Sequence, residues 1–215
     1  SSVRFINNTI KGFFNVAVVN AFMPNVFTLR SDYCTNLVCQ DNTATSLRSS
    51  VGGAATTGAS LLRLTSLDGV ANAPFNWGTI VVRDNVVGSD GVSVTQLLHL
   101  NLIVPDTIKI DGNEVTVMWN SAGAVTLLNI VSLTYGNSSA NVWATVVQDN
   151  DFRFNNTSDT DLTFELLFIA ATIPRLHVVD FSGNHITMDR GTRTFGAGNT
   201  QGIDIENTIG ITNLT

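Results

Sequence analysis

Polar and apolar residues alternate in a short phrase that recurs along the chain. In residues 106–117, the run Asp-Thr-Ile-Lys-Ile-Asp-Gly-Asn-Glu-Val-Thr-Val consists of two alternating stretches that meet around Asn113. Alternation with a period of two is typical of β-strands with one buried face, so this segment alone predicts a hairpin. The phrase occurs at further places, however, and its central asparagines are Asn8, Asn42, Asn85, Asn113, Asn150, Asn184 and Asn207.

Four positions of each copy are mostly apolar and are predicted to point inward: those five and three residues before the asparagine, and those two and four after it. In the clearest copy they are Ile108, Ile110, Val115 and Val117. At Asn150 they are Thr145, Val147, Phe152 and Phe154, and at Asn184 they are Val179, Phe181, Ile186 and Met188. The copy at Asn207 needs a deletion before Ile203 and Ile205 take these positions. Each copy therefore predicts one strand on either side of an asparagine turn.

A second recurring element lies between these copies. It is a pair of leucines followed two residues later by another apolar residue, at residues 61–64, 97–100, 127–130 and 166–169. Val18-Val19 is a fainter version in the first interval. The element predicts a third, more continuously apolar strand in each repeat.

The common polarity and internal order of the repeats favour a parallel β-helix of about seven coils, formed as a single domain by residues 1–215. The spacing between asparagines varies from 23 residues (Asn184 to Asn207) to 43 residues (Asn42 to Asn85), which indicates loops of variable length. Asparagine tolerates the left-handed conformation that tight corners require, and its amide can bond to copies above and below. The seven asparagines are therefore predicted to form a ladder. The alternative is an antiparallel β-sandwich.

The composition argues against nucleic acid as a binding partner and against a membrane span. Charged residues make up 13% of the chain, against roughly 25% in a typical soluble domain, and Asn, Thr, Ser and Gly supply the polarity. The lysines are Lys11 and Lys109, and no basic run could neutralise a phosphate backbone, so nucleic-acid binding is not expected. The apolar runs are too short and too interrupted to span a bilayer.

Cysteines and sequons point to an extracellular setting. Cys34 and Cys39 lie five residues apart, without nearby partners for a metal site. Two alternatives stay open: a disulfide between Cys34 and Cys39 that ties a loop, or a buried thiol at the inward position of Cys39. Sequons place candidate glycosylation sites at Asn7, Asn137, Asn155, Asn156 and Asn213. These features together predict a secreted or cell-surface protein.

The repeats resemble known β-helix families. Phrases of the form Ile-x-Val-x-x-Asn-x-Val, separated by long loops, resemble the pectin-lyase-like superfamily of right-handed parallel β-helices. Leu-Leu-Arg-Leu at residues 61–64 is also similar to the trypanosomatid surface proteins known as the dispersed gene family. Chlamydial polymorphic outer-membrane proteins match in part: residues 5–8, 152–155 and 181–184 fit their Phe-x-x-Asn motif, but only residues 52–54 approach their Gly-Gly-Ala-Ile motif. The resemblance implies a right-handed solenoid, and it requires that an activity on polysaccharides be tested.

No catalytic constellation is recognised in the sequence. The Asp-Asp, His-Gly and Arg-x-Lys elements of polygalacturonase-like sites are absent, and the three histidines (His99, His177 and His185) occupy different strand positions, so neither a metal site nor a cofactor is predicted. Aspartates recur beside the turn asparagines, at Asp41, Asp84, Asp111 and Asp149. They either support the turns or form a row that binds calcium. Three tryptophans either pack under loops or offer platforms for sugar rings: Trp77, Trp119 and Trp143.

The expected function is that of a non-catalytic extracellular structural or adhesive β-helix. No polar cap is recognised at either end of the repeats, which predicts that the solenoid continues in a larger surface protein or meets another copy end to end. The expected partners are other protein chains or further repeats at the solenoid ends, and glycans. The alternative is a polysaccharide lyase, a glycosidase or a carbohydrate-binding module on the same scaffold.

Overall fold

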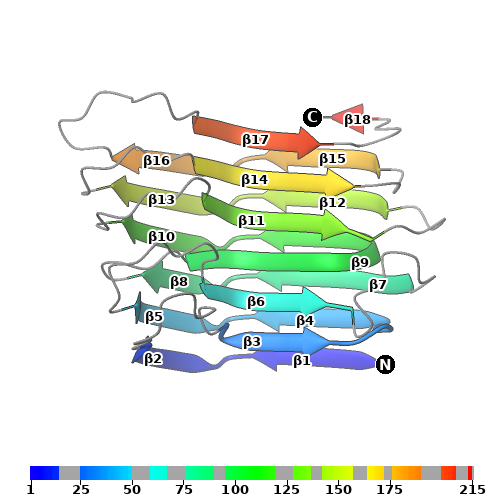
Figure 1. Ribbon diagram of the computed structural model, residues 1–215, viewed down its shortest axis with the longest axis horizontal. Coiled ribbons are helices and arrows are strands. Elements are labelled where there is room, and N and C mark those ends of the chain that lie inside the picture. Colours follow the sequence, from blue (N-terminus) through cyan, green and yellow to red (C-terminus); the bar gives the residue numbers. More distant parts are fainter. Residues whose placement is uncertain are drawn as a thin grey trace.

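The computed structural model of the chain is an all-β parallel solenoid (Figure 1). It describes residues 1–14, 25–49, 59–66, 76–89, 95–119, 128–136, 142–156, 164–171, 176–189, 200–206 and 213–214. Every strand pairing in these ranges is parallel, so the predicted β-helix is confirmed and the sandwich alternative is wrong. The described part of the chain contains no helix that could cross a membrane.

The strands form three faces that run along the solenoid. The first face contains β1 (Ser2–Ile6), β4 (Asn36–Gln40), β7 (Asn76–Arg83), the second half of β9 (Thr95–Asp111), β12 (Val142–Gln148), β15 (Leu176–Ser182) and β18 (Asn213–Leu214). The second face contains β2 (Thr9–Phe14), β5 (Thr43–Ser49), β8 (Val86–Ser89), β10 (Glu114–Trp119), β13 (Asp151–Asn156) and β16 (His185–Asp189). The third face contains β3 (Phe27–Arg30), β6 (Ala59–Thr65), the first half of β9, β11 (Leu128–Tyr135), β14 (Phe164–Ala171) and β17 (Thr200–Glu206).

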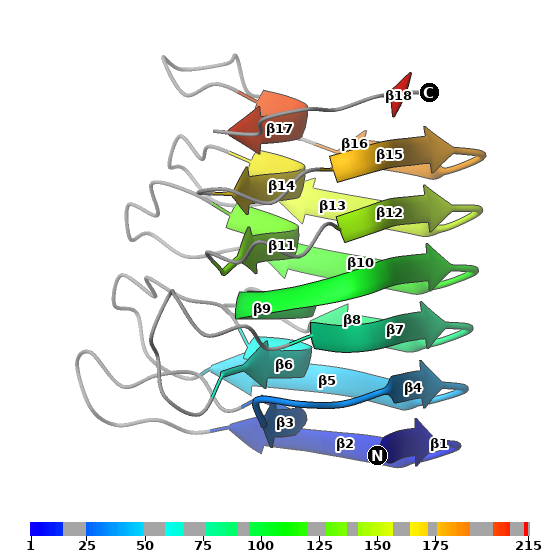
Figure 2. The same cartoon turned by 90° about the vertical axis from the view of Figure 1, so that its right-hand side faces the viewer.

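Each passage of the chain through the three faces makes one level of the solenoid. Level 1 begins with β1, levels 2 to 5 begin with β4, β7, the second half of β9 and β12, and level 6 begins with β15. As the chain rises in Figure 1, strands of the third face run left to right in front, and strands of the first face run right to left behind. Figure 2 shows the same order of faces from the side. The solenoid is therefore right-handed, the sense of nearly all parallel crossover connections.

The segment around Asn113 shows why the hairpin prediction is wrong. The strand before the turn, the end of β9, pairs with β7 and β12 of the neighbouring levels. The strand after the turn, β10, pairs with β8 and β13. The two alternating runs lie on different faces, and each finds its hydrogen-bond partners one level above and below.

The inward columns fill the interior. Among the residues predicted to point inward, the fully buried ones include Ile80, Val82, Ile108, Ile110, Val115, Val117, Val147 and Phe152. Burying one such side chain contributes roughly 1.5–3 kcal/mol. Ile186, also predicted to be inward, is 42% exposed because β16 is the last strand of the second face in the described ranges.

Among the described inward positions, that of Thr145 carries a polar side chain. Thr145 is fully buried, and its hydroxyl lies 2.8 Å from the hydroxyl of Tyr135, which is also buried. Tyr135 is the last residue of β11, where the third face ends. The hydroxyl pair therefore satisfies a buried polar group that would otherwise destabilise the core.

The leucine pairs of the third face mark a bend in each strand. Leu61 and Leu62 are consecutive, yet both are fully buried. The register pairs Ser60 with Gln96 and Leu62 with Leu98, and passes over Leu61, so the strand bends there and both side chains face the interior. The predicted pair at residues 127–128 is wrong, because the residue level with Leu98 is Val131.

Two further register predictions concern the ends of the chain. Val18 and Val19 lie outside the described residues, and the third strand of level 1 is β3. Ile203 and Ile205 pair with Leu167 and Ile169 on the third face, so their predicted place on the first face is wrong. The strand that continues the first face is β18, and Asn207 itself lies outside the described residues.

Candidate functional site

The corner between the first and second faces carries a continuous asparagine ladder. From Asn8 to Asn150, the backbone N–H and the side-chain Nδ2 of each ladder asparagine both donate to the Oδ1 of the asparagine one level up. The distances are 3.0–3.1 Å from the backbone nitrogen and 2.8–2.9 Å from Nδ2. The rungs are Asn8, Asn42, Asn85, Asn113, Asn150 and Asn184.

Each amide is also bonded to the level below. The Nδ2 of Asn85 donates to the carbonyl of Cys39 at 3.0 Å, and that of Asn113 donates to the carbonyl of Val82 at 2.9 Å. The same bond recurs at the other rungs from Asn42 to Asn184. Because a backbone N–H must meet an acceptor, the network also fixes which amide atom is oxygen and which is nitrogen.

The left-handed residue of each corner precedes the ladder asparagine. Asparagine itself was expected to adopt that conformation, and this expectation is wrong. Positive φ angles of 53–66° occur at Asn7, Asp41, Asp84, Gly112, Asp149 and Gly183. Asn, Asp and Gly are the residues that enter this region most readily, so the preceding position is chosen for its backbone and the ladder position for its side chain.

The acidic row beside the ladder is explained by this geometry. Asp41, Asp84 and Asp149 are exposed turn residues with positive φ, while Asp111 lies one position earlier, at the end of β9. The described residues contain no group of three or more His, Cys, Asp and Glu side chains arranged to hold a metal ion. The interpretation of three of these aspartates as turn residues agrees with the structure, and nothing in the described ranges supports a calcium row.

A charged cluster that was missed from the sequence lies on the outer side of the second face. Arg153 on β13 contacts Glu114 on β10 at 3.3 Å and forms a hydrogen bond with Asp151 on its own strand. His185 on β16 places Nδ1 3.2 Å from Asp151 Oδ1. Three of these residues directly follow ladder asparagines in the sequence, so aligning the copies one position further would have shown Glu114, Asp151 and His185 in one column.

The electrostatics of this charged cluster do not fit a general acid at Asp151. The hydrogen bond from Arg153, together with that from His185, holds the pKa of the Asp151 carboxyl below its usual range. A glycosidase acid needs the opposite shift, since it must hold its proton near neutral pH. Arg153 also lies between the two carboxylates, and the side chains of Glu114 and Arg153 are about half exposed. The charged cluster is best described as a surface ion-pair network, which stabilises the fold only weakly.

Of the two alternatives for the cysteines, the structure has the buried thiol and not the disulfide, because Cys34 and Cys39 are both free and buried. Cys39 points inward from β4, where burial raises the pKa of its thiol to about 12. The Cys34 sulfur instead lies near the carbonyl oxygens of Ser1 and Asn36. The extended strand from Asn36 to Cys39 carries the two sulfurs apart, since a disulfide needs Cα atoms within about 7 Å.

The tryptophans do not form an exposed row in the part of the chain that the structure describes. Trp77 is buried, Trp143 is 57% exposed, and the side chain of Trp119 lies outside the description. His99 is half-buried on the third face, and His177 is on β15. A shared site for the three histidines is not seen among the described side chains.

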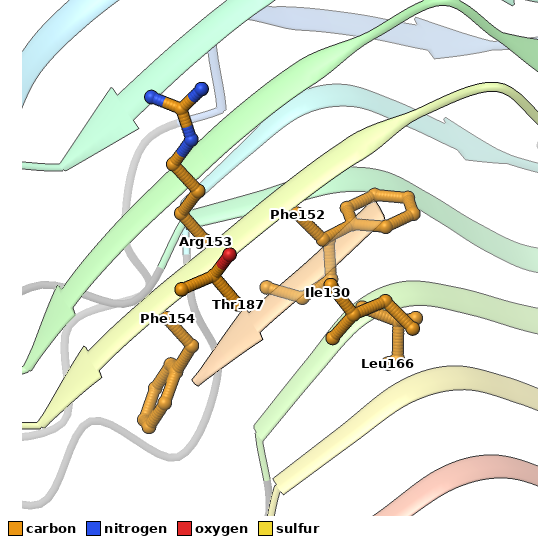
Figure 3. Close-up of a pocket in the computed structure, with 7 residues that line it drawn as sticks. Ile130, Phe152, Arg153, Phe154, Leu166 and Thr187 are labelled. Atoms are coloured by element: carbon orange, nitrogen blue, oxygen red, sulfur yellow. The ribbon is translucent and has the colours of Figure 1, made fainter. Parts of the chain in front are cut away.

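One apolar hollow opens between the second and third faces near the last levels (Figure 3). The side chains around it include Ile130, Phe152, Phe154 and Leu166, and they leave gaps too narrow for a water molecule. In Figure 3 the guanidinium of Arg153 extends away from Ile130 and Leu166. The hollow therefore lacks both the space and the polar groups of a ligand site.

The candidate glycosylation sites are placed only in part. Asn7 is exposed at the corner of level 1, and Asn155 is half-buried on β13. Asn156 and Asn213 lie on strands but their side chains are not described, and Asn137 lies outside the described residues.

These features define the class of protein. The chain is a right-handed parallel β-solenoid with a buried asparagine ladder along one edge. No family model, no curated protein and no solved structure matches it.

Proposed function

We propose that the chain is a non-catalytic structural or adhesive module of an extracellular β-helix protein. The observation that carries this proposal is the ladder, which links six levels and whose four central rungs are buried amides with hydrogen-bond partners above and below. Such an edge resists bending and spreading, because opening it would leave several buried amide groups unpaired at once. A stiff rod with long flat faces suits a spacer or an adhesive stalk.

The direction of the ladder favours growth at the ends. The bonds between rungs all have one direction: from Asn8 to Asn150, each asparagine donates to the Oδ1 of the next rung toward the C-terminal end. Further levels, whether they belong to the same chain or to a second copy, would extend the network only in the same polarity. We therefore propose that the module continues as part of a longer solenoid, or associates head to tail.

Membership in the pectin-lyase-like superfamily, and the narrower kinship with the trypanosomatid dispersed gene family, are part of this proposal. The right-handed coil and the recurring Ile-x-Val-x-x-Asn phrase support the first. Secretion or display on the cell surface is supported by the exposed sequon at Asn7 and by the low content of charged residues. Glycans are proposed both as modifications and as binding partners.

The alternative function is an action on polysaccharides. It is favoured by the two neighbouring carboxylates, Glu114 and Asp151, and by the exposed ring of Trp143. The lowered pKa of Asp151 and the position of Arg153 count against catalysis at this place.

A screen of polysaccharide cleavage and glycan binding separates the two functions. The structural proposal expects no release of reducing or unsaturated ends from any polysaccharide of a broad panel. Turnover that is lost in a Glu114→Gln, Asp151→Asn variant, but kept in a Lys11→Gln control on the same face, would overturn it. Glycan binding that is lost in Trp143→Ala, without turnover, would identify an adhesive surface.

A further inference from the structure

The outer surface of the first face is flat and regularly ordered. Strand register places two columns of outward residues side by side from level 1 to level 6. The inner column, four residues before each ladder asparagine, is Arg4, Val38, Val81, Lys109, Val146 and Asp180. The corner column, two residues before it, is Ile6, Gln40, Arg83, Asp111, Gln148 and Ser182.

The charges on this face become complementary when a second copy of the face is placed opposite it with the order of its levels reversed. In the inner column a cation, Arg4, stands at level 1 and an anion, Asp180, at level 6. In the corner column Arg83 stands at level 3 and Asp111 at level 4. Reversing the level order exchanges level 1 with 6, level 2 with 5 and level 3 with 4, so each of these charges meets its opposite.

A two-fold axis along the strands, between levels 3 and 4, produces this exchange. Such an axis turns the face over while each column stays opposite itself, which gives an isologous interface. Arg83 of each copy then faces Asp111 of the other, and Arg4 faces Asp180. Val38 faces Val146, and Gln40 faces Gln148.

The least favourable pairing is that of Lys109. The same axis places Lys109 of each copy opposite Val81 of the other, near the centre of the face. The alkyl stem of lysine can cover a valine while its ammonium group reaches toward the solvent at the rim. The position contributes less than the arginine–aspartate pairs, and it introduces no like-charge contact in its own column.

The exposed aromatic side chains at the edge of this face follow the same symmetry. Tyr33 is 58% exposed and lies beside β4 of level 2, and Trp143 is 57% exposed on β12 of level 5. The axis that exchanges level 2 with level 5 brings Tyr33 of one copy toward Trp143 of the other. Aromatic side chains of this kind are enriched in protein interfaces and often anchor them.

The dimensions of the face match those of a stable dimer. Six levels at about 4.8 Å and strands of about five residues give roughly 500 Å² of flat surface on each copy. With the aromatic edge included, the total buried by two copies is on the order of 1,200 Å², the lower bound of stable interfaces. We propose that the first face binds a second copy of this chain, face to face and with reversed direction, through reciprocal Arg83–Asp111 pairs at its centre.

Charge reversal tests the pairing directly. Sedimentation equilibrium of the wild type is expected to give twice the chain mass of 23.0 kDa. Arg83→Asp places carboxylates opposite Asp111 twice in each dimer, and Asp111→Arg places guanidinium groups opposite Arg83 twice. Each single variant is expected to dissociate at concentrations where the wild type is dimeric. The double variant R83D/D111R restores opposite charges and is expected to restore the dimer.

A matched control makes the same charge change on another face. Lys11→Asp lies on β2 of the second face, where the side chain is exposed, and is expected to leave the dimer intact. Circular dichroism of each variant verifies the fold. The proposal is overturned if the wild type sediments as a 23.0 kDa species throughout, or if R83D/D111R remains monomeric while folded. Open-ended assemblies that are insensitive to Arg83→Asp would also overturn it, while supporting head-to-tail association.

Discussion

The two corners that flank the first face are built in opposite ways. The asparagine corner has two residues at every described level, as at Gly112 and Asn113 between β9 and β10. The corner between the third and first faces varies: β9 passes through it without interruption, whereas the five residues 31–35 separate β3 from β4. The same solenoid thus has one edge of constant length and one edge whose length changes.

The difference follows from where the corner groups find their partners. In the asparagine corner the side chains of successive levels bond to one another, so an added residue would displace a rung and strand its neighbours. In β9 the other corner is turned by Leu102, a non-glycine residue with a φ of 58°. Above it, a Cβ on Gly136 would lie 2.9 Å from the Leu102 carbonyl oxygen. Packing and backbone fit hold this corner, and both tolerate different solutions at different levels.

Removing a central rung should produce the largest effect. Asn113→Ala leaves the backbone N–H and one Nδ2 hydrogen of Asn85 without their acceptor, and leaves the carbonyl of Val82 without that donor. At about 1–3 kcal/mol for each stranded buried group, the free energy of unfolding should fall by about 3–5 kcal/mol. Urea denaturation followed by circular dichroism measures this change.

The exposed end of the ladder supplies the control for that variant. Asn8→Ala removes the Nδ2 donor to Asn42 Oδ1 but keeps the backbone N–H donor and strands no buried donor, so a loss of about 1 kcal/mol is expected. Equal losses for Asn8→Ala and Asn113→Ala would show that burial of the ladder does not set the stability of this edge.

The third face should respond to acid through His99. Burial, with a smaller contribution from the neighbouring Arg63, lowers the pKa of His99 to about 4, and Ser132 flanks it on the other side. The unfolded chain takes up this proton near pH 6.5, so stability falls as the pH drops from 6.5 toward 4, by at most about 3 kcal/mol. Denaturation of wild type and His99→Gln across this range should show a smaller decline in the variant. Parallel declines would assign the effect to other groups.

Breaking the buried hydroxyl pair of Tyr135 and Thr145 should have a smaller effect on stability. Tyr135→Phe leaves the buried hydroxyl of Thr145 without its partner, and Thr145→Val does the same to Tyr135. Each single change should destabilise by about 1–2 kcal/mol, while the double change should cost less than the sum. A double-mutant cycle measures the coupling. Strict additivity would mean that the two hydroxyls do not interact.

The smallest change is expected at Leu102. Because leucine in the left-handed region is strained by roughly 1–2 kcal/mol, and asparagine tolerates that region, Leu102→Asn should be neutral or stabilising by up to about 1 kcal/mol. Asp84→Val, at a ladder corner with a φ of 54°, should destabilise by about 1–2 kcal/mol. Thermal denaturation compares the two. A clear loss in Leu102→Asn would show that side-chain packing, and not the backbone, holds this corner.

The sequence predicted the asparagine edge better than the other two. A period of two on either side of Asn113 shows both the strands and their inward residues, because each inward residue stacks on its equivalent one level away. The third face was harder, since the bend at Leu61 breaks the alternation, and Ile130-Val131 was missed in favour of the more conspicuous Leu127-Leu128. Ile203 and Ile205 were assigned to the wrong face because apolar alternation does not distinguish one face from another.

The electrostatic features required the register of the strands. Glu114 and Arg153 are far apart in sequence, and only the pairing of β10 with β13 brings them together. The residue with the left-handed backbone conformation also lies one position before the ladder asparagine, for which the sequence predicted that conformation. The ladder uses the side chain of one residue and the backbone of the residue before it.

The ladder also gives the solenoid an electrical axis. The carboxamide groups from Asn42 to Asn184 point the same way, because each Oδ1 accepts from the N-terminal side, and up to Asn150 one Nδ2 hydrogen is donated toward the C-terminal end. Aligned amide dipoles sum as they do in an α-helix, but here the negative pole lies at the N-terminal end and the positive pole at the C-terminal end. In a reversed pair of solenoids these dipoles would run in opposite directions and partly cancel, whereas a head-to-tail series would add them.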